Sequence, residues 1–262
     1  MIRLLLDMDG VLVKDKALNP FPETADLLTF LRKNNVPFRV VSNNSTKPTD
    51  SIVGRLKEKG INISEEEFIS PVGILKDYLI RRKLTNVFFI GTQDVEDYLR
   101  HSGIEVRRDY RVQAVVIGQD RNINFEKIKI ATSAIFLSSA KIIPINLSRI
   151  VKDDDGLYFP GAGSLAYMLA HACNYNEEIP NLGKPSKDFI EFALLGLKGD
   201  ETYLVSDDLY TDLIGAKDLC IKTVFMTTGK YDRRELERAN FHPDIVFDNL
   251  KQLMSFLETS IE

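Results

Sequence analysis

Short apolar runs alternate with amphipathic stretches through most of the chain, and this alternation is the strongest constraint on its fold. The spacing predicts a strand at residues 2–8, a helix at 23–35, a strand at 38–41 and a helix at 49–59. Later strand-like runs, again separated by helical patterns, are NVFFIGT, AVVIGQD, TYLVSDD, KTVFMTT and DIVFDN. Because strands that alternate with helices of ten or more residues form βαβ units, we predict an α/β protein with a doubly wound parallel sheet.

Composition narrows the class of protein. The chain has 262 residues, with 34 basic and 38 acidic side chains and a formal net charge of −4, so we expect neither a nucleic acid nor a membrane surface as its partner. It has no leader-like N-terminus, and no apolar run approaches the roughly 20 residues of a membrane span. Cys173 and Cys220 are interpreted as buried thiols rather than a disulfide, which favours a cytoplasmic protein.

Polar side chains follow several predicted strands where those strands end. In a doubly wound sheet, ligands bind beyond the carboxyl ends of the strands. Carboxylates there can hold a divalent cation, while lysine and hydroxyl groups can hold the oxygens of an anion. The residues concerned are Asp7 and Asp9 after the first strand, Ser42 and Asn43 after the second, Asp207, Asp208 and Asp212 after TYLV, and Lys184 before a helix that starts near Ser186.

Four motifs in this order resemble those of the haloacid dehalogenase (HAD) superfamily of phosphotransferases. DMDGV resembles the first motif, DxDG[TV], VVSNNS the second, GKP the third and VSDDLYTDLIGA the acidic fourth. SNNST and YFPGAGS are similar to stretches of the NagD-like subgroup, which includes p-nitrophenyl phosphatases. Members of that subgroup carry a large α/β cap of the C2 type between the second and third motifs. We therefore expect a HAD catalytic core at residues 1–72 plus 179–262, and an α/β cap domain at residues 73–178.

The resemblance implies a Mg²⁺-dependent phosphatase of small phosphate monoesters, such as sugar phosphates or phosphoglycolate, with p-nitrophenyl phosphate as an artificial substrate. Asp7 would be the nucleophile that forms an aspartyl-phosphate. Asp9 would protonate the leaving oxygen and then deprotonate the attacking water.

The resemblance also implies which residues bind the metal and the phosphate. Mg²⁺ would be held by the Asp7 carboxylate, the Asp9 main-chain carbonyl and Asp207. Asp212 would act behind these ligands by orienting a water, with Asp208 as the alternative. The transferring phosphoryl group would be held by Ser42, Asn43 and Lys184.

Two stretches depart from the family pattern. Ser206 stands where the family usually has glycine, and we expect little damage to metal binding from this change. In the cap, relatives often carry a TNPD-like stretch, where this chain reads PINLSR and keeps only Asn146 of that pattern. If this loop contacts the substrate, we expect unusual specificity. Caps of the subgroup often associate, so the resemblance also suggests a homodimer through the cap.

Other interpretations remain open at this point. A receiver-like signalling domain also collects an acceptor aspartate, a hydroxyl and a lysine at a sheet edge, and a metabolite-binding protein without catalysis would show a similar fold. The acid two residues after Asp7 favours turnover over storage of a phosphoryl group. GAGSLA superficially resembles a dinucleotide fingerprint but follows a proline, so a turn that opens a helix is favoured. The run Asp153–Asp155 is interpreted as a solvated turn.

Overall fold

The computed structural model describes residues 1–152 and 157–261, so the run Asp153–Asp155 lies outside the described residues. The chain forms two compact units. The first comprises Met1–Ser42, Thr49–Ile69 and Lys184–Glu262, and the second comprises Asn43–Pro48 and Ser70–Gly183. The identification of a catalytic core at 1–72 plus 179–262 and a cap at 73–178 stays a prediction.

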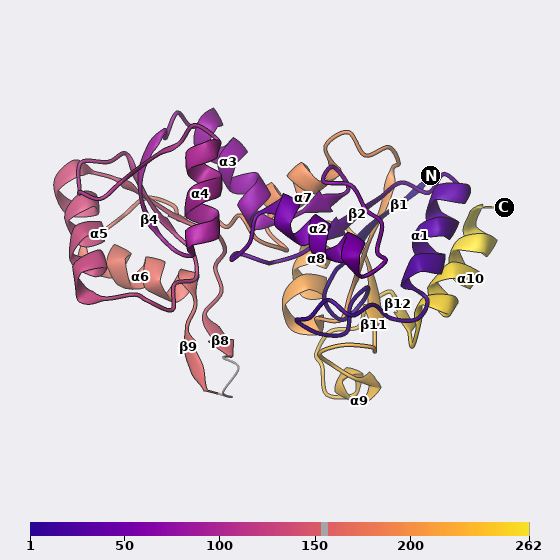
Figure 1. Ribbon diagram of the computed structural model, residues 1–262. Helices are drawn as coiled ribbons and strands as arrows, with labels where there is room; N and C mark the ends of the chain where they lie inside the picture. The colour runs from indigo at the N-terminus through magenta and orange to yellow at the C-terminus, as the bar shows by residue number, and fades with distance from the viewer. Residues whose placement is uncertain (153–156, 262) are drawn as a thin grey trace. The chain divides into compact units, whose positions relative to one another are not determined.

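The first unit is built on a six-stranded parallel sheet with the strand order β12-β11-β10-β1-β2-β3 (Figure 1). The chain winds outward from the central β1, through β2 and β3 on one side and through β10, β11 and β12 on the other. The predicted doubly wound parallel sheet is therefore confirmed. The strands are β1 (Ile2–Asp7), β2 (Phe38–Val41), β3 (Phe68–Ile69), β10 (Glu201–Ser206), β11 (Lys222–Met226) and β12 (Ile245–Phe247).

Helices cover both faces of this sheet, which explains why β1 is apolar without interruption. Leu4 and Leu6 face one core and Leu5 faces the other, because side chains alternate along a strand. The first core is closed by α1 (Thr24–Lys33), α2 (Thr49–Glu58) and α10 (Leu250–Ile261), of which α1 and α10 lie side by side in Figure 1. The unit also contains α7 (Lys187–Leu194), the π-helix η1 (Leu209–Leu213), α8 (Ile214–Asp218) and α9 (Arg233–Leu236).

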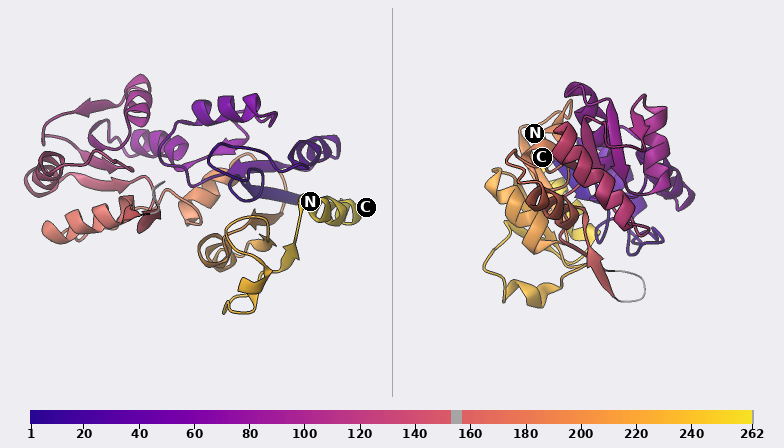
Figure 2. Two further views of the ribbon diagram at one scale, coloured as in Figure 1. Left: turned by 60° about the horizontal axis from the view of Figure 1, so that its bottom comes forward. Right: turned by 90° about the vertical axis from the view of Figure 1, so that its left-hand side faces the viewer.

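The second unit has its own four-stranded parallel sheet, with the order β5-β4-β6-β7. Figure 2 shows α5 and α6 side by side on one face, where their alanines and Ile135 close an apolar core. The elements are α3 (Pro71–Arg81), β4 (Asn86–Ile90), α4 (Gln93–His101), β5 (Glu105–Arg107), β6 (Ala114–Ile117), α5 (Phe125–Ser138), β7 (Lys141–Pro144), the antiparallel pair β8 (Ile150–Lys152) and β9 (Tyr158–Pro160), and α6 (Ala162–Ala172).

Five strands of the structure, β3, β5, β7, β8 and β9, were not predicted from the sequence pattern. The strands β3, β5, β8 and β9 have only two or three residues each, too few to produce a periodic signal, and β7 follows the apolar end of α5 so closely that the two patterns merge. Cys173 and Cys220 are free thiols, as interpreted, but the expectation that both are buried is wrong. Cys173 directly follows α6 and is partly exposed at the edge of an apolar core, whereas Cys220 is exposed in the turn after α8, two residues beyond its end. Within the described ranges, no helix is both long and apolar enough to cross a membrane.

Candidate active site

Three buried carboxylates gather in the first unit, at the carboxyl ends of β1 and β10. Leu6 is in register with Val205, so the next residues, Asp7 and Ser206, end the two neighbouring strands together. Asp207 follows directly, and Asp212 belongs to η1, which begins two residues later. Asp7, Asp207 and Asp212 are only 5%, 7% and 3% exposed. This burial is costly for three acids, so their surroundings must supply compensating charge or hydrogen bonds.

Lys184 bridges two of these acids. Its Nζ lies 2.7 Å from Oδ1 of Asp7 and 2.8 Å from Oδ2 of Asp212. Burial alone would lower the pKa of Lys184, but the carboxylates of Asp212 and Asp7 outweigh burial and raise it, so the ammonium stays charged. Ser186 accepts a hydrogen bond from the main-chain N–H of Phe189 (3.2 Å) as the N-cap of α7, which anchors the segment that carries Lys184.

The site carries more negative charge than this lysine offsets. Burial raises the pKa of the Asp7 carboxyl well above its ordinary value, and the ammonium of Lys184 opposes this only in part. Three further carboxylates raise the pKa of Asp7 still more, namely Asp212, Asp9 and Asp207. Lys184 is the only buried lysine or arginine among the residues that the structure describes. The surplus of negative charge therefore favours a bound cation.

Asp9 lies in a different environment from Asp7. The strand ends at Asp7, Met8 packs into the apolar core, and the side chain of Asp9 is exposed. The loss of surrounding water nevertheless raises the pKa of Asp9, while Lys184 and a hydrogen bond from the buried hydroxyl of Ser42 lower it. Ser42 therefore contacts the predicted acid–base residue directly, and its predicted contact with phosphate stays a prediction.

Two of the predicted residues are engaged by other parts of the chain. Asn43 belongs to the second unit, where its main-chain carbonyl accepts a hydrogen bond from Nδ2 of Asn146 (3.2 Å). Asp208 caps η1 by accepting from the main-chain N–H groups of Tyr210 (3.1 Å) and Thr211 (3.0 Å). Because this capping role engages Asp208, Asp212 is the better-placed acid beside Lys184.

The sequence patterns missed the loop that follows β11. The main-chain N–H of Lys230 donates to Oδ2 of Asp207 (2.5 Å), although burial still raises the pKa of Asp207 to about 6. A Cβ atom at Gly10 would lie 2.0 Å from Oδ2 of Asp207, and one at Gly229 would lie 1.9 Å from it, so only glycines leave room for this carboxylate. The TTGK run directly follows KTVFM in the sequence. Its position at the carboxyl end of a predicted strand could have identified it as part of the site.

The oxygen donors of this region fit a hard divalent cation. Within residues 1–152 and 157–261, no three His, Cys, Asp or Glu side chains are arranged as a metal-ligand cluster. The predicted set contains only two side chains, Asp7 and Asp207, together with the main-chain carbonyl of Asp9. All three donors are oxygens. Gly10 and Gly229 have no Cβ atom, and this leaves room for the carboxylate of Asp207. Such a set suits Mg²⁺, which retains several water ligands in most protein sites.

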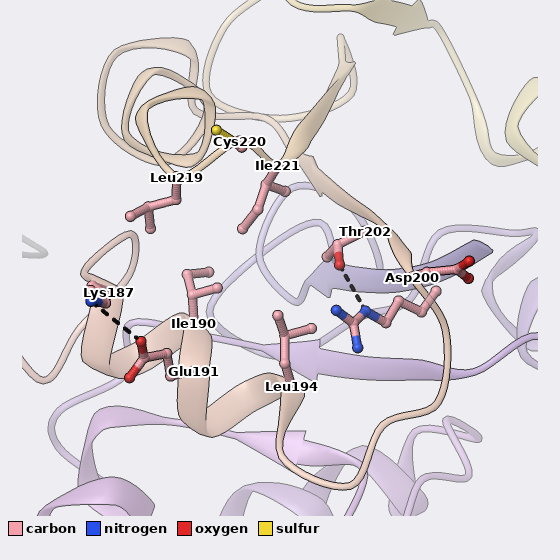
Figure 3. Close-up of a pocket in the computed structure, with 10 residues that line it drawn as sticks. Lys187, Ile190, Glu191, Leu194, Asp200, Thr202, Leu219, Cys220 and Ile221 are labelled. Carbon is pink, nitrogen blue, oxygen red and sulfur yellow. Dashed lines mark hydrogen bonds and ion pairs between the residues drawn. The ribbon is translucent and has the colours of Figure 1, made fainter. Parts of the chain in front are cut away.

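The first unit also has a cavity of about 320 Å³ at the opposite edge of its sheet. Figure 3 shows Ile190, Leu194 and Ile221 pointing toward its middle, and four of its polar side chains form two pairs. Lys187 is paired with Glu191, and Arg3 donates to Thr202 (2.7 Å). This cavity lies at the amino ends of the strands, whereas ligands of parallel sheets bind at the carboxyl ends.

The PINLSR stretch of the second unit is held by structural contacts. Oδ1 of Asn146 accepts from the main-chain N–H of Ser148 (3.1 Å) in addition to the bond that its Nδ2 makes with Asn43. The GAGS turn packs directly onto this stretch, since a Cβ atom at Gly163 would lie 2.6 Å from the carbonyl carbon of Leu147. GAGSLA is therefore the tightly packed start of α6, as the turn interpretation expected.

Comparison with known proteins gives a consistent result. A family model described as haloacid dehalogenase-like hydrolase matches residues 4–105, and one described as HAD-hydrolase-like matches residues 181–253. An acid sugar phosphatase of Staphylococcus epidermidis is 27% identical over 257 residues, which cover 97% of each chain.

Solved structures agree over nearly the full length. A p-nitrophenyl phosphatase from Archaeoglobus fulgidus is 29% identical with a TM-score of 0.85, covering 97% of this chain and 98% of that one. A 4-nitrophenylphosphatase from Thermotoga maritima is 25% identical with a TM-score of 0.84, covering 97% and 96% of the two chains. The similarity therefore includes both compact units.

Proposed function

The chain is a phosphatase of the haloacid dehalogenase-like hydrolase family, and from this premise we propose that it hydrolyses small phosphate monoesters with Mg²⁺ through an aspartyl-phosphate at Asp7. Sugar phosphates, phosphoglycolate and related metabolites are the proposed natural substrates, and p-nitrophenyl phosphate is the proposed artificial one. The names of the similar proteins, an acid sugar phosphatase and p-nitrophenyl phosphatases, support the sugar phosphates and p-nitrophenyl phosphate among these. The observation that carries the proposal is the buried carboxylate of Asp7, held by Lys184 at the end of β1, with a second acid two residues further on.

The two aspartates would divide the reaction between them. A carboxylate oxygen of Asp7 would attack the phosphorus, and the bond from phosphorus to the ester oxygen would break as Asp9 protonates that oxygen. Asp9 would then take a proton from a water whose oxygen attacks the same phosphorus. This second step would release inorganic phosphate and restore the carboxylate of Asp7. The raised pKa of Asp9 supports a carboxyl that is protonated when the leaving group departs.

Lys184 would change its role as substrate arrives. In the structure its ammonium is shared between Asp7 and Asp212, 2.7 and 2.8 Å away. A phosphoryl group on Asp7 would bring further negative charge to the same ammonium, which is already desolvated and needs little reorganisation. Ser42 and Asn43 are the other proposed phosphate ligands.

Mg²⁺ would be held by the carboxylates of Asp7 and Asp207 and by the main-chain carbonyl of Asp9. When bound, the ion would offset the repulsion between the acids and the incoming phosphate. Asp212 would not bind the metal itself. It would hold Lys184 in place through its ion pair with that lysine.

Metal affinity should depend on pH through Asp207. The pKa of Asp207 is raised to about 6 by burial, so its ionisation destabilises the metal-free fold as pH rises through 6, and a bound cation reverses this penalty. We expect the rise in melting temperature caused by Mg²⁺ to be larger at pH 7.5 than at pH 5. Thermal denaturation at both pH values measures it. Equal shifts at both values, or an undiminished shift in Asp207→Asn, would contradict the assignment.

Replacing Asp9 with asparagine should slow hydrolysis in a way that depends on the leaving group. A poor leaving group such as an alkyl alcohol needs protonation, whereas p-nitrophenolate departs more readily without it. We expect a loss of about 100-fold or more for an alkyl phosphate and a smaller loss for p-nitrophenyl phosphate. Steady-state kinetics on both esters measure the difference, and equal losses would argue against Asp9 as the acid.

A panel of phosphorylated metabolites, assayed for phosphate release with Mg²⁺ and again with EDTA, tests the proposed function. Asp7→Asn assayed in parallel measures any contaminating phosphatase. We expect one class of ester to stand out in kcat/KM and EDTA to abolish its hydrolysis. No hydrolysis of any ester above the Asp7→Asn background would refute the proposal.

Association of two copies through residues 73–178 also stays a prediction. Large apolar side chains are exposed on α5 and α6, which belong to that segment, namely Phe125, Phe136, Leu137, Tyr167 and Met168. Patches of exposed apolar residues often mark interfaces. Light scattering should give twice the mass of the chain, and Phe136→Glu should reduce it to that of one copy. A wild-type protein with the mass of a single chain would exclude the dimer.

A further inference from the structure

Ser206 is the last residue of β10, in direct contact with the acids described above. It is fully buried, and its hydroxyl oxygen lies 3.1 Å from Oδ2 of Asp7 and 3.0 Å from Oδ2 of Asp212. The main-chain N–H of Asp208 donates to the same hydroxyl oxygen (3.1 Å). Ser206 therefore contacts both acids that share the ammonium of Lys184.

A count of donors assigns the single hydroxyl proton of Ser206. Oδ2 of Asp212 already accepts from Nζ of Lys184, whereas Lys184 contacts the other oxygen of Asp7, Oδ1. The hydroxyl of Ser206 lies within hydrogen-bond distance of Oδ2 of Asp7, opposite the oxygen that forms the ion pair with Lys184. Because Oδ2 of Asp212 already has a charged donor, we assign the hydroxyl proton of Ser206 to the hydrogen bond with Asp7 when that carboxyl is ionised.

We propose that Ser206 is a positioning residue for Asp7: its hydroxyl and the ammonium of Lys184 each hold one oxygen of the nucleophile and so fix the plane of its carboxylate. This inference rests on the proposed function of Asp7. Once the phosphoryl group is attached, the carboxylate charge is lost, and the hydroxyl proton can turn to Oδ2 of Asp212, 3.0 Å away. When phosphate is released, the hydroxyl of Ser206 turns back and donates its hydrogen bond to Asp7 again.

Such a contact acts on orientation rather than on binding of the ester. An attacking oxygen must approach the phosphorus in line with the leaving oxygen, and a carboxylate held at one oxygen only is free to rotate out of that line. Loss of the hydroxyl should therefore lower kcat and leave KM nearly unchanged.

The kinetic experiment compares Ser206→Ala, Ser206→Thr and a matched control, Thr223→Val. Thr223 is also a fully buried β-strand residue whose hydroxyl donates to a carboxylate, that of Asp244 (2.7 Å), but it lies at the amino end of β11. With p-nitrophenyl phosphate we expect Ser206→Ala to lose about tenfold in kcat with KM within about twofold, as for one hydrogen bond to a charged group. Ser206→Thr should restore most of kcat, and Thr223→Val should leave kcat unchanged.

A second measurement does not need turnover and covers the case in which Ser206→Thr fails to fold. Melting temperatures with Mg²⁺ are compared for wild type, Ser206→Ala, Asp7→Asn and the double variant. If the hydroxyl holds the Asp7 carboxylate, Ser206→Ala should lower the melting temperature more in the wild-type background than in the Asp7→Asn background. The two decreases should differ by more than the roughly 1 °C expected of independent sites.

The two measurements separate the possible failures. Additive melting temperatures, or a kcat of Ser206→Ala within twofold of wild type, would overturn the positioning role. If the wild-type protein hydrolysed no ester while the melting temperatures remained non-additive, the proposed function would fail but the contact between Ser206 and Asp7 would stand.

Discussion

Asp7→Asn should abolish hydrolysis of p-nitrophenyl phosphate, with a loss of about a thousandfold or more, while the protein remains folded. The amide oxygen of asparagine is a poor nucleophile, and it cannot carry the phosphoryl group as a carboxylate does. The measurement is phosphate release under saturating substrate with Mg²⁺. Undiminished turnover in the variant would exclude Asp7 as the nucleophile.

The same substitution should leave the metal-free protein as stable as before, or more stable. Burial raises the pKa of Asp7 well above its ordinary value, so the folded state favours the neutral carboxyl more than the unfolded state does. The sign follows directly: ionisation of Asp7 lowers stability as pH rises above its unfolded pKa, and a neutral amide of the same shape removes that penalty. Thermal denaturation of both proteins at pH 7.5 in EDTA tests this expectation.

Asp244→Asn is the matched control for Asp7→Asn, because we expect it to lower stability slightly and to leave activity unchanged. Burial of the Asp244 carboxyl would raise its pKa, but the hydroxyl and the main-chain N–H of Thr223 outweigh burial and lower it. The ionised form therefore stabilises the fold, and the variant should melt at a slightly lower temperature above the ordinary pKa of aspartate. Solvent screens this exposed group, so the loss should be small. Its kcat should equal that of wild type.

Lys184→Met should strongly destabilise the fold. It removes the ammonium that lies between Asp7 and Asp212 and leaves two buried carboxylates without it. Breaking a buried ion pair from one side costs about 3–5 kcal/mol. We also expect kcat/KM to fall by about 100-fold or more, because the proposed phosphate-binding charge is lost. Urea denaturation and steady-state kinetics measure the two effects.

The destabilisation of Lys184→Met should grow with pH. Lys184 is the group that lowers the pKa of Asp7 against burial, so its removal raises that pKa further. A carboxyl with a raised pKa loses folding stability as pH rises, so the difference from wild type should be greater at pH 8 than at pH 5. Lys184→Arg keeps the charge and serves as the control. A loss of stability that is independent of pH would indicate a packing defect instead of unpaired acids.

Much of the architecture was predictable from local patterns. The strand at residues 38–41 was predicted with its observed bounds, and the apolar run before Asp7 is the buried central strand. These predictions succeeded because the apolar spacing of a strand or helix is a local property, repeated within each element. The shortest strands could not be predicted for the same reason, since two residues contain no period.

The positions of the acids at the carboxyl ends of β1 and β10 also followed from the chain alone, because parallel strands of one sheet end at the same edge. The contacts among their side chains did not. The bridge from Lys184 to Asp7 and Asp212, and the hydroxyl of Ser206 between the same two acids, depend on strand order, register and the path of η1. Burial, which raises the pKa of Asp7 and Asp207, likewise exists only once distant segments pack together. Residue types and strand ends are local, whereas charge compensation in a buried site is decided by tertiary structure.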